Sequence, residues 1–169
     1  MNGESADEFW EFSLALYSQP DVAAYCLRLQ DDAGANVNLL LFCCWTGRRG
    51  VALDARALVA AAAAIEDWQV RVLRPLRARR RTAGIAPAEK QRLLAEELTA
   101  ERHEQALLVQ WLEDCGPVPL IAVGDGAVCA RANLDRYCAA LGVALERDNP
   151  LLTHGPFGVL SFPTDSTRR

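Results

Sequence analysis

Three polar residues interrupt the apolar stripes of two long helices that the sequence predicts. On the helix predicted over residues 87–114, Glu101 and Gln105 continue a stripe of leucines spaced three and four residues apart. On the helix predicted over residues 55–82, the central position of the matching stripe is Gln69. If these two helices fold back on each other, the three side chains form a buried polar layer between them.

This polar layer has two interpretations, and both stay open on the sequence alone. In the first, the layer fixes the register of the two helices, as a polar residue does in the seam of a coiled coil. In the second, it lines a small ligand pocket under a helix kink at Pro75. A buried carboxylate is costly unless it is paired, and one arginine projects to the same side about two turns away. The residues of this layer or pocket are Gln69, Arg80, Glu101, Gln105 and Asn38, with Trp45 or Trp68 as a wall.

A cluster of arginines is the second feature that could do chemistry. Six of the 17 arginines fall within eleven residues, namely Arg71, Arg74, Arg77, Arg79, Arg80 and Arg81. Helical spacing puts Arg71, Arg74 and Arg81 on the solvent face, with Arg77 at its margin. Such a face can bind phosphates or an acidic partner through bidentate contacts. Alternatively, the charge is used inside the molecule, because residues 85–114 carry seven acidic side chains against three basic ones.

The residue patterns of common catalytic and metal sites are missing from this sequence. It has no G-x-S-x-G elbow, no phosphate-binding glycine loop with lysine, no dinucleotide fingerprint and no D-D-x-x-D motif. His103 is predicted on the polar side of its helix and His154 in the tail, so a histidine general base is not expected. The six cysteines form no C-x-x-C pair, which argues against a metal site and a disulfide-linked partner. No catalytic residue, metal or cofactor is therefore assigned, and the sequence favours a protein that is not an enzyme.

The composition predicts one all-α domain that positions these residues. Of 169 residues, 28 are alanine and 24 are leucine, with 51% hydrophobic and 24% charged overall. Cap residues, prolines and glycines predict about six helices in a compact bundle, with residues 1–148 as the domain and residues 149–169 as a mobile tail. The segment 118–128 is read as a marginal β-hairpin or a packed loop. The helices are expected from Ser5 to about residue 17, and over residues 20–32, 36–47, 55–82, 87–114 and 133–141, the fourth and fifth forming a long antiparallel hairpin.

The charge and hydropathy of the chain limit the kinds of partner and the cellular location that we expect. The net charge is −4, which argues against general nucleic-acid binding. No apolar run reaches the length that crosses a bilayer, and the first residues are acidic where a signal peptide would be basic. We expect a cytoplasmic protein that does not bind membranes.

Several motifs are spread over roughly residues 7–142. They are FWxFSLxLY at residues 9–17, LxLQD at residues 27–31, VNLLLFC at residues 37–43, and later Trp68, Val72, PLR at 75–77, Arg79, Arg80, EEL at 96–98, Glu101, Gln105, Asn133, Leu134 and Tyr137. With these motifs the sequence resembles an uncharacterised family of small bacterial proteins, a domain of unknown function. The resemblance implies a small, soluble, helical protein without an activity to carry over, and it includes Asn38, Glu101 and Gln105 as positions that break the helical pattern.

Taken together, these features favour a non-enzymatic helical protein that binds or regulates another protein. The predicted contact surface is the arginine face, Arg71, Arg74, Arg77 and Arg81, and the partner itself is unknown. The competing hypothesis is a small-ligand or enzymatic pocket at Gln69, Glu101, Gln105 and a tryptophan. A third hypothesis, nucleic-acid binding through the arginines, is disfavoured by the acidic total.

Overall fold

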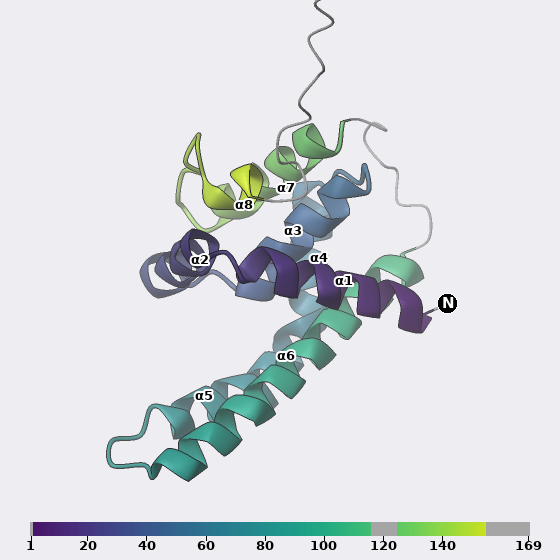
Figure 1. The fold of residues 1–169 in the computed structure, drawn as a ribbon. Helices are drawn as coiled ribbons and strands as arrows, with labels where there is room; N and C mark the ends of the chain where they lie inside the picture. The colour runs from purple at the N-terminus through teal and green to yellow at the C-terminus, as the bar shows by residue number, and fades with distance from the viewer. Residues whose placement is uncertain (1, 116–124, 155–169) are drawn as a thin grey trace, which may run out of the picture.

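A computed structural model describes residues 2–115 and 125–154, and this part of the chain contains helices, turns and loops without strands. The predicted all-α bundle is therefore confirmed (Figure 1). The elements are α1 (Asn2–Tyr17), α2 (Pro20–Ala33), α3 (Val37–Arg48), α4 (Ala55–Trp68), the π-helical turn η1 (Gln69–Leu73), α5 (Arg74–Arg80), α6 (Pro87–Asp114), α7 (Gly126–Ala140) and α8 (Pro150–Thr153). None of the described helices is both long enough and apolar enough to span a bilayer.

Helix α3 lies at the centre of the bundle because it is apolar all round. Every residue from 38 to 47 is buried, and α1, α2, α6, α7 and α8 all pack against it. Phe42 and Trp45 extend from α3 into an aromatic cluster with Phe9 of α1, whose ring lies 5.0 Å from that of Trp45 between centroids. Burial of these large side chains supplies much of the hydrophobic stabilisation of the fold.

Helices α3 and α7 cross at close range, and this crossing depends on a glycine. A Cβ atom placed on Gly47 would lie 2.3 Å from the backbone of Ala130 in α7. Beside this crossing, the buried Asn133 side chain of α7 accepts a hydrogen bond from the Leu53 amide at 2.7 Å and donates to the Val51 carbonyl at 2.9 Å. The amide of Asn133 thereby holds the loop that follows α3 against α7.

The predicted fourth helix is one continuous helical rod interrupted by a π-helical turn. Proline lacks an N–H group, and its ring crowds the preceding turn of an α-helix. Here the strain at Pro75 is accommodated just before it, where η1 widens the turn and the Arg74 amide donates to the carbonyl of Gln69, five residues earlier. The interruption therefore lies at residues 69–73, and α5 and α6 then form the arm of the predicted antiparallel hairpin.

Two predicted helix starts are wrong. Helix α1 begins at Asn2, so Ser5 lies within the helix instead of capping it, and Glu4 in the first turn favours this earlier start through the helix dipole. Helix α7 begins at Gly126, seven residues before the predicted start, because the Asp125 side chain caps it by accepting from the Ala127 amide at 2.8 Å. Of the segment read as a hairpin or loop, residues 126–128 are helical, and most of the remainder lies outside the described residues.

The folded part of the chain extends past the predicted domain boundary at residue 148. Asn149 and Leu151 are fully buried, and α8 packs against α2, α3 and α7. The hydrophobic pattern of the sequence does not predict this helix because α8 has only four residues, which are too few for a helical period to be visible. The rest of the predicted tail, residues 155–169, lies outside the described residues.

The crossing of α3 and α7 generates a stability prediction. Gly47→Ala should lower the free energy of unfolding by about 3 kcal/mol, because the added methyl group meets backbone atoms that cannot move away alone. Urea unfolding followed by circular dichroism measures the change. The control is Gly3→Ala in α1, where nothing lies within 4 Å of the added atom. Equal unfolding midpoints for the two variants would contradict the proposed close packing.

Candidate functional site

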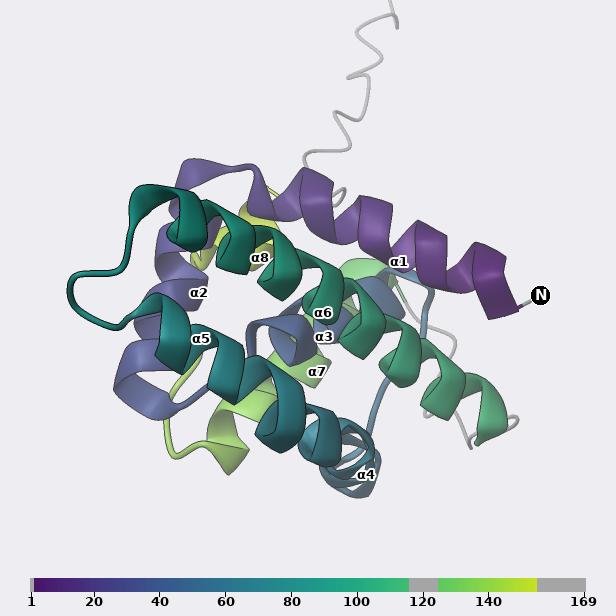
Figure 2. The ribbon, with the colours of Figure 1, turned by 90° about the horizontal axis from the view of Figure 1, so that it is seen from below.

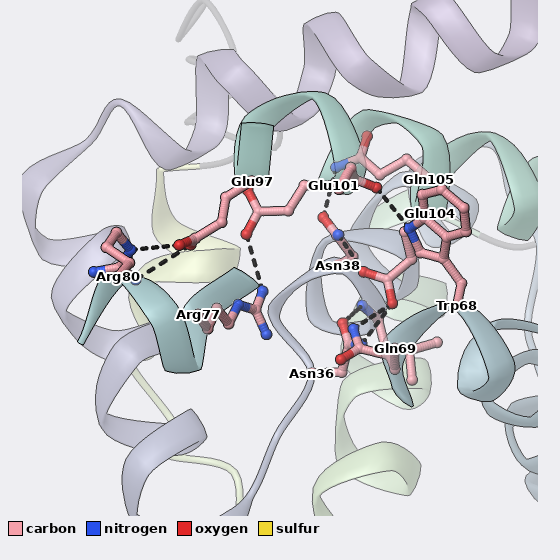
Figure 3. Close-up of polar contacts among 12 residues, drawn as sticks. Asn36, Asn38, Trp68, Gln69, Arg77, Arg80, Glu97, Glu101, Glu104 and Gln105 are labelled. Atoms are coloured by element: carbon pink, nitrogen blue, oxygen red, sulfur yellow. Dashed lines mark hydrogen bonds and ion pairs between the residues drawn. The ribbon is translucent and has the colours of Figure 1, made fainter. Parts of the chain in front are cut away.

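A fully buried carboxylate, Glu104 of α6, is the centre of the polar layer between the helices. Its side chain accepts hydrogen bonds from the amide groups of Asn38 at 2.6 Å, Asn36 at 3.1 Å and Gln69 (Figure 3). Gln105 extends the network by donating to the Asn38 carbonyl oxygen at 2.8 Å. Within the described part of the chain, no basic side chain forms an ion pair with Glu104. Neutral amides alone therefore hold this buried carboxylate.

The backbone around α3 and η1 explains how three amides reach one carboxylate. Asn36 is the N-cap of α3, where its side chain also accepts from the Leu39 amide at 3.1 Å, and Asn38 lies in the first turn. The positive end of the α3 dipole thus adds to the stabilisation of the Glu104 charge. Gln69 is the first residue of the π-helical turn. π-Helical turns are often found at functional sites.

The structure groups the predicted layer residues differently from the sequence analysis. Gln69, Asn38 and Gln105 join the Glu104 network, whereas Glu101 turns towards the arm and pairs with Arg77 at 2.9 Å. The sequence pattern does not identify Glu104, because the predicted stripe of leucines runs through Leu94 and Leu98, which are 40% and 50% exposed. The stripe that is buried along α6 includes Leu93, Glu97, Ala100, Glu104 and Leu108. Its spacing of three and four residues was the signal that could have identified Glu104.

Two ion pairs link the arm helices beside this layer. Arg80 of α5 donates to both carboxylate oxygens of Glu97, at 2.5 and 3.2 Å, and this contact raises the pKa of the Arg80 guanidinium. Burial raises the pKa of the Glu101 carboxyl, and the bound guanidinium of Arg77 offsets part of that effect. The charge of these two arginines is therefore largely matched within the hairpin.

The exposed arginines are mostly paired as well. Arg71 contacts Asp67 at 2.7 Å and Arg74 contacts Glu66 at 3.0 Å, so both find acids on their own helical rod and not on α6. Arg79 reaches Glu89 of α6 at 3.3 Å. In the described part of the chain, Arg81 is the member of the cluster that has no ion pair.

A cavity of about 300 Å³ lies between α1, α2, α3, α5 and α6. Figure 2 shows the side of the molecule on which α1 and α5 flank α6. Seven large hydrophobic side chains are exposed in the described part of the chain, and four of them line this one cavity. The four, each between 40% and 50% exposed, are Leu14, Leu27, Leu94 and Leu98.

The lining of the cavity also contains buried polar groups without partners. Ser13 of α1 is 3% exposed and Gln105 is 1% exposed, and both side chains line the cavity. The Ser13 hydroxyl and the Gln105 carbonyl oxygen have no hydrogen-bond partner in the described structure. Buried polar atoms are nearly always paired, so these two require an explanation.

The cavity is lined by a tryptophan other than the two predicted from the sequence. Trp45 is 1% exposed within the aromatic core, and Trp68 faces away, donating to the Ala100 carbonyl at 3.0 Å beside the ring of His103. Trp10 of α1 lines the cavity instead. Gln69 lines a second cavity, of about 200 Å³, together with Asn36. The lining of the first cavity thus includes residues of the predicted set, but without Gln69, Trp45 or Trp68; they are Glu101, Gln105, Asn38, Arg77, Arg80 and Arg81.

The chemistry open to the cavity is recognition through charge, hydrogen bonding and apolar contact. Glu104 does not line the cavity, and both of its oxygens already accept hydrogen bonds. Glu97 and Glu101 line the cavity, but each is held by an arginine. Among the described residues, no group of three or more histidine, cysteine or acidic side chains is arranged to hold a metal ion.

The Glu104 network generates a second stability prediction. Glu104→Leu should lower the free energy of unfolding by about 3 kcal/mol, because it removes the acceptor from the buried amides of Asn38 and Gln69 and from the partly buried amide of Asn36. Glu113→Gln, at an exposed position of the same helix, should change it by less than about 0.5 kcal/mol. Chemical denaturation of both variants provides the measurement. A Glu104→Leu protein as stable as the wild type would show that the network contributes nothing to the fold.

The comparisons with known proteins bear on the region that builds this site. Neither the curated proteins nor the solved structures gave a match to the chain. A family model described as "Protein of unknown function (DUF2390)" matches residues 8–108, which include every residue of the Glu104 network and of the cavity lining. Because this match covers more than half of the 169 residues, the chain belongs to the DUF2390 family of proteins of unknown function.

Proposed function

We propose that this protein binds a small molecule in the cavity between α1, α2, α3, α5 and α6. The observation that carries the proposal is the convergence of four exposed leucines with two buried, unpartnered polar groups around a single cavity. Ligand sites in proteins are concave, mainly apolar, and contain a few polar groups that orient the ligand. The volume of about 300 Å³ is at the lower end of the range for such sites.

The exposure of the leucines supports ligand binding over a purely structural role. Leaving a leucine side chain fully in water forfeits about 1.5–3 kcal/mol relative to full burial, and these four side chains are about half exposed. Scattered exposed leucines are ordinary on a protein surface, but a contiguous group around a cavity marks a binding surface. The Glu104 network holds part of the cavity lining in place, because Asn38 and Gln105 belong both to the network and to the lining.

A direct test uses a neutral apolar probe. N-phenyl-1-naphthylamine should bind to the native protein with increased fluorescence, and Leu98→Asp should weaken binding at least about tenfold by placing a charge among the leucines. Fluorescence titration gives the dissociation constants. Val59→Asp, which alters a 67% exposed side chain on α4 away from the cavity, is the matched control. Equal binding by the wild type and Leu98→Asp would refute the cavity as the binding site.

The arginine face is a second candidate site, for an acidic protein partner. Arg71 and Arg74 keep 75% and 57% of their side-chain surface exposed despite their ion pairs. Exposed ion pairs contribute only about 0–1 kcal/mol, so an acidic partner can replace Asp67 or Glu66 at little cost. This candidate has less support than the cavity, because most of the positive charge is already matched within the chain.

The two candidates differ in the variants that affect them. The double substitution Arg71→Glu, Arg74→Glu should abolish recovery of a partner when the tagged protein is purified from its own cell, because the exposed face reverses its charge. Mass spectrometry identifies the proteins that are recovered with the wild type but not with the double variant. Arg56→Glu, a charge reversal at an exposed position of α4, is the control. Unchanged recovery with the double variant would remove the arginine face as a contact surface.

A further inference from the structure

The chemistry of the cavity lining indicates which class of ligand it takes. We infer that the ligand is an anionic amphiphile: an aliphatic chain with a carboxylate at one end, held by Arg81, and a hydroxyl group towards the other end, held by Ser13 and Gln105. This inference rests on the proposed function and adds the chemical class of the ligand. Its three parts follow from the unpaired charge, the leucines and the unpaired polar atoms of one cavity.

The charge of the ligand follows from the ion pairs at the arm end of the cavity. Three arginines and two glutamates line the cavity, and Arg77 and Arg80 are paired with Glu101 and Glu97. Arg81, at the end of α5, remains without an ion pair in the described structure. The lining thus has one unmatched positive charge, which favours a ligand with one negative charge.

The apolar part of the ligand follows from where the leucines lie relative to that charge. Leu94 and Leu98 occupy successive turns of α6 at the arm end, where Arg81 follows the last residue of α5. Leu14 of α1 and Leu27 of α2 supply apolar surface from the facing helices. An aliphatic chain that leaves the arginine would therefore contact leucines from three helices, and each buried methylene group contributes about 0.8 kcal/mol.

The hydroxyl group of the ligand is inferred from the unpaired polar atoms at the far end of the cavity. Gln105 lies eleven residues beyond Leu94, which corresponds to about 16 Å along a helix. Its amide nitrogen already donates to Asn38, so its free carbonyl oxygen can only accept, and Figure 3 shows this oxygen pointing away from Asn38. The Ser13 hydroxyl can both donate and accept. A ligand hydroxyl placed here satisfies both atoms, donating to Gln105 and accepting from Ser13.

The experiment compares four probes that share a twelve-carbon chain, as competitors of N-phenyl-1-naphthylamine below their micelle concentrations. They are 12-hydroxydodecanoate, dodecanoate, 1-dodecanol and dodecyltrimethylammonium. The wild type should bind 12-hydroxydodecanoate most tightly, dodecanoate at least about tenfold more weakly because both neutral hydrogen bonds of the ligand hydroxyl are lost, and the cation most weakly. Isothermal titration calorimetry with the full chain confirms the order.

Two variants separate the contributions of the two ends. Arg81→Gln should weaken both carboxylates about fivefold and leave 1-dodecanol unchanged, whereas Arg56→Gln, at an exposed position outside the cavity, should change none. Ser13→Ala should weaken 12-hydroxydodecanoate about three- to tenfold and leave dodecanoate unchanged, because one of the two hydrogen bonds of the ligand hydroxyl is lost. Because the Ser13 hydroxyl has no partner in the described structure, this variant should keep the thermal stability of the wild type.

The outcomes distinguish this inference from the proposed function. If the neutral probe binds but the four competitors displace it equally, the cavity is a binding site and the inferred ligand class is wrong. If Arg81→Gln leaves the carboxylates unaffected, Arg81 is not the anion-binding group. If neither the neutral probe nor any competitor binds, the proposed function itself fails.

Discussion

A buried carboxylate without a cationic partner must obtain its hydrogen bonds from within the protein, and the rest of this structure depends on that requirement at Glu104. Its donors come from two separate parts of the chain, the start of α3 and the start of η1. Leaving a buried polar group unpaired costs about 1–3 kcal/mol. Alternative registers of α6 against α3 and η1 would lose these bonds, so the network selects one arrangement of the three.

The register set by Glu104 also determines where the cavity lies. Beyond the network, α5 and α6 continue as an arm past the central helix α3, as Figure 1 shows. The leucines of α6 in this arm are left without the close core packing of α3, and α1 and α2 enclose them only in part. The proposed binding site is thus the space between a rigid core and its protruding hairpin. Gln105 and Asn38 connect this space to the Glu104 network.

The distribution of charge distinguishes positions that look alike in the sequence. The arginines of η1 and α5 are close in the chain, yet Arg77 and Arg80 are half-buried partners of α6 acids while Arg71 and Arg74 are exposed and pair along their own helical rod. Exposed pairs exchange readily with solvent or a partner, whereas partly buried pairs help to hold two helices together. Arg81 differs from all of these because no carboxylate is positioned to meet it in the described structure.

The sequence by itself determined the helical class, the antiparallel hairpin, the central position of the apolar helix α3 and the involvement of Gln69 and Gln105 in a polar cluster, because these follow from local periodicity and capping. Only the tertiary structure decided that Glu104 and not Glu101 is the buried carboxylate. The two differ by three residues, less than one helical turn, so the choice depends on a small rotation of α6 that its packing fixes. The cavity was likewise beyond the sequence, since its lining comes from five helices whose relative placement no local pattern encodes.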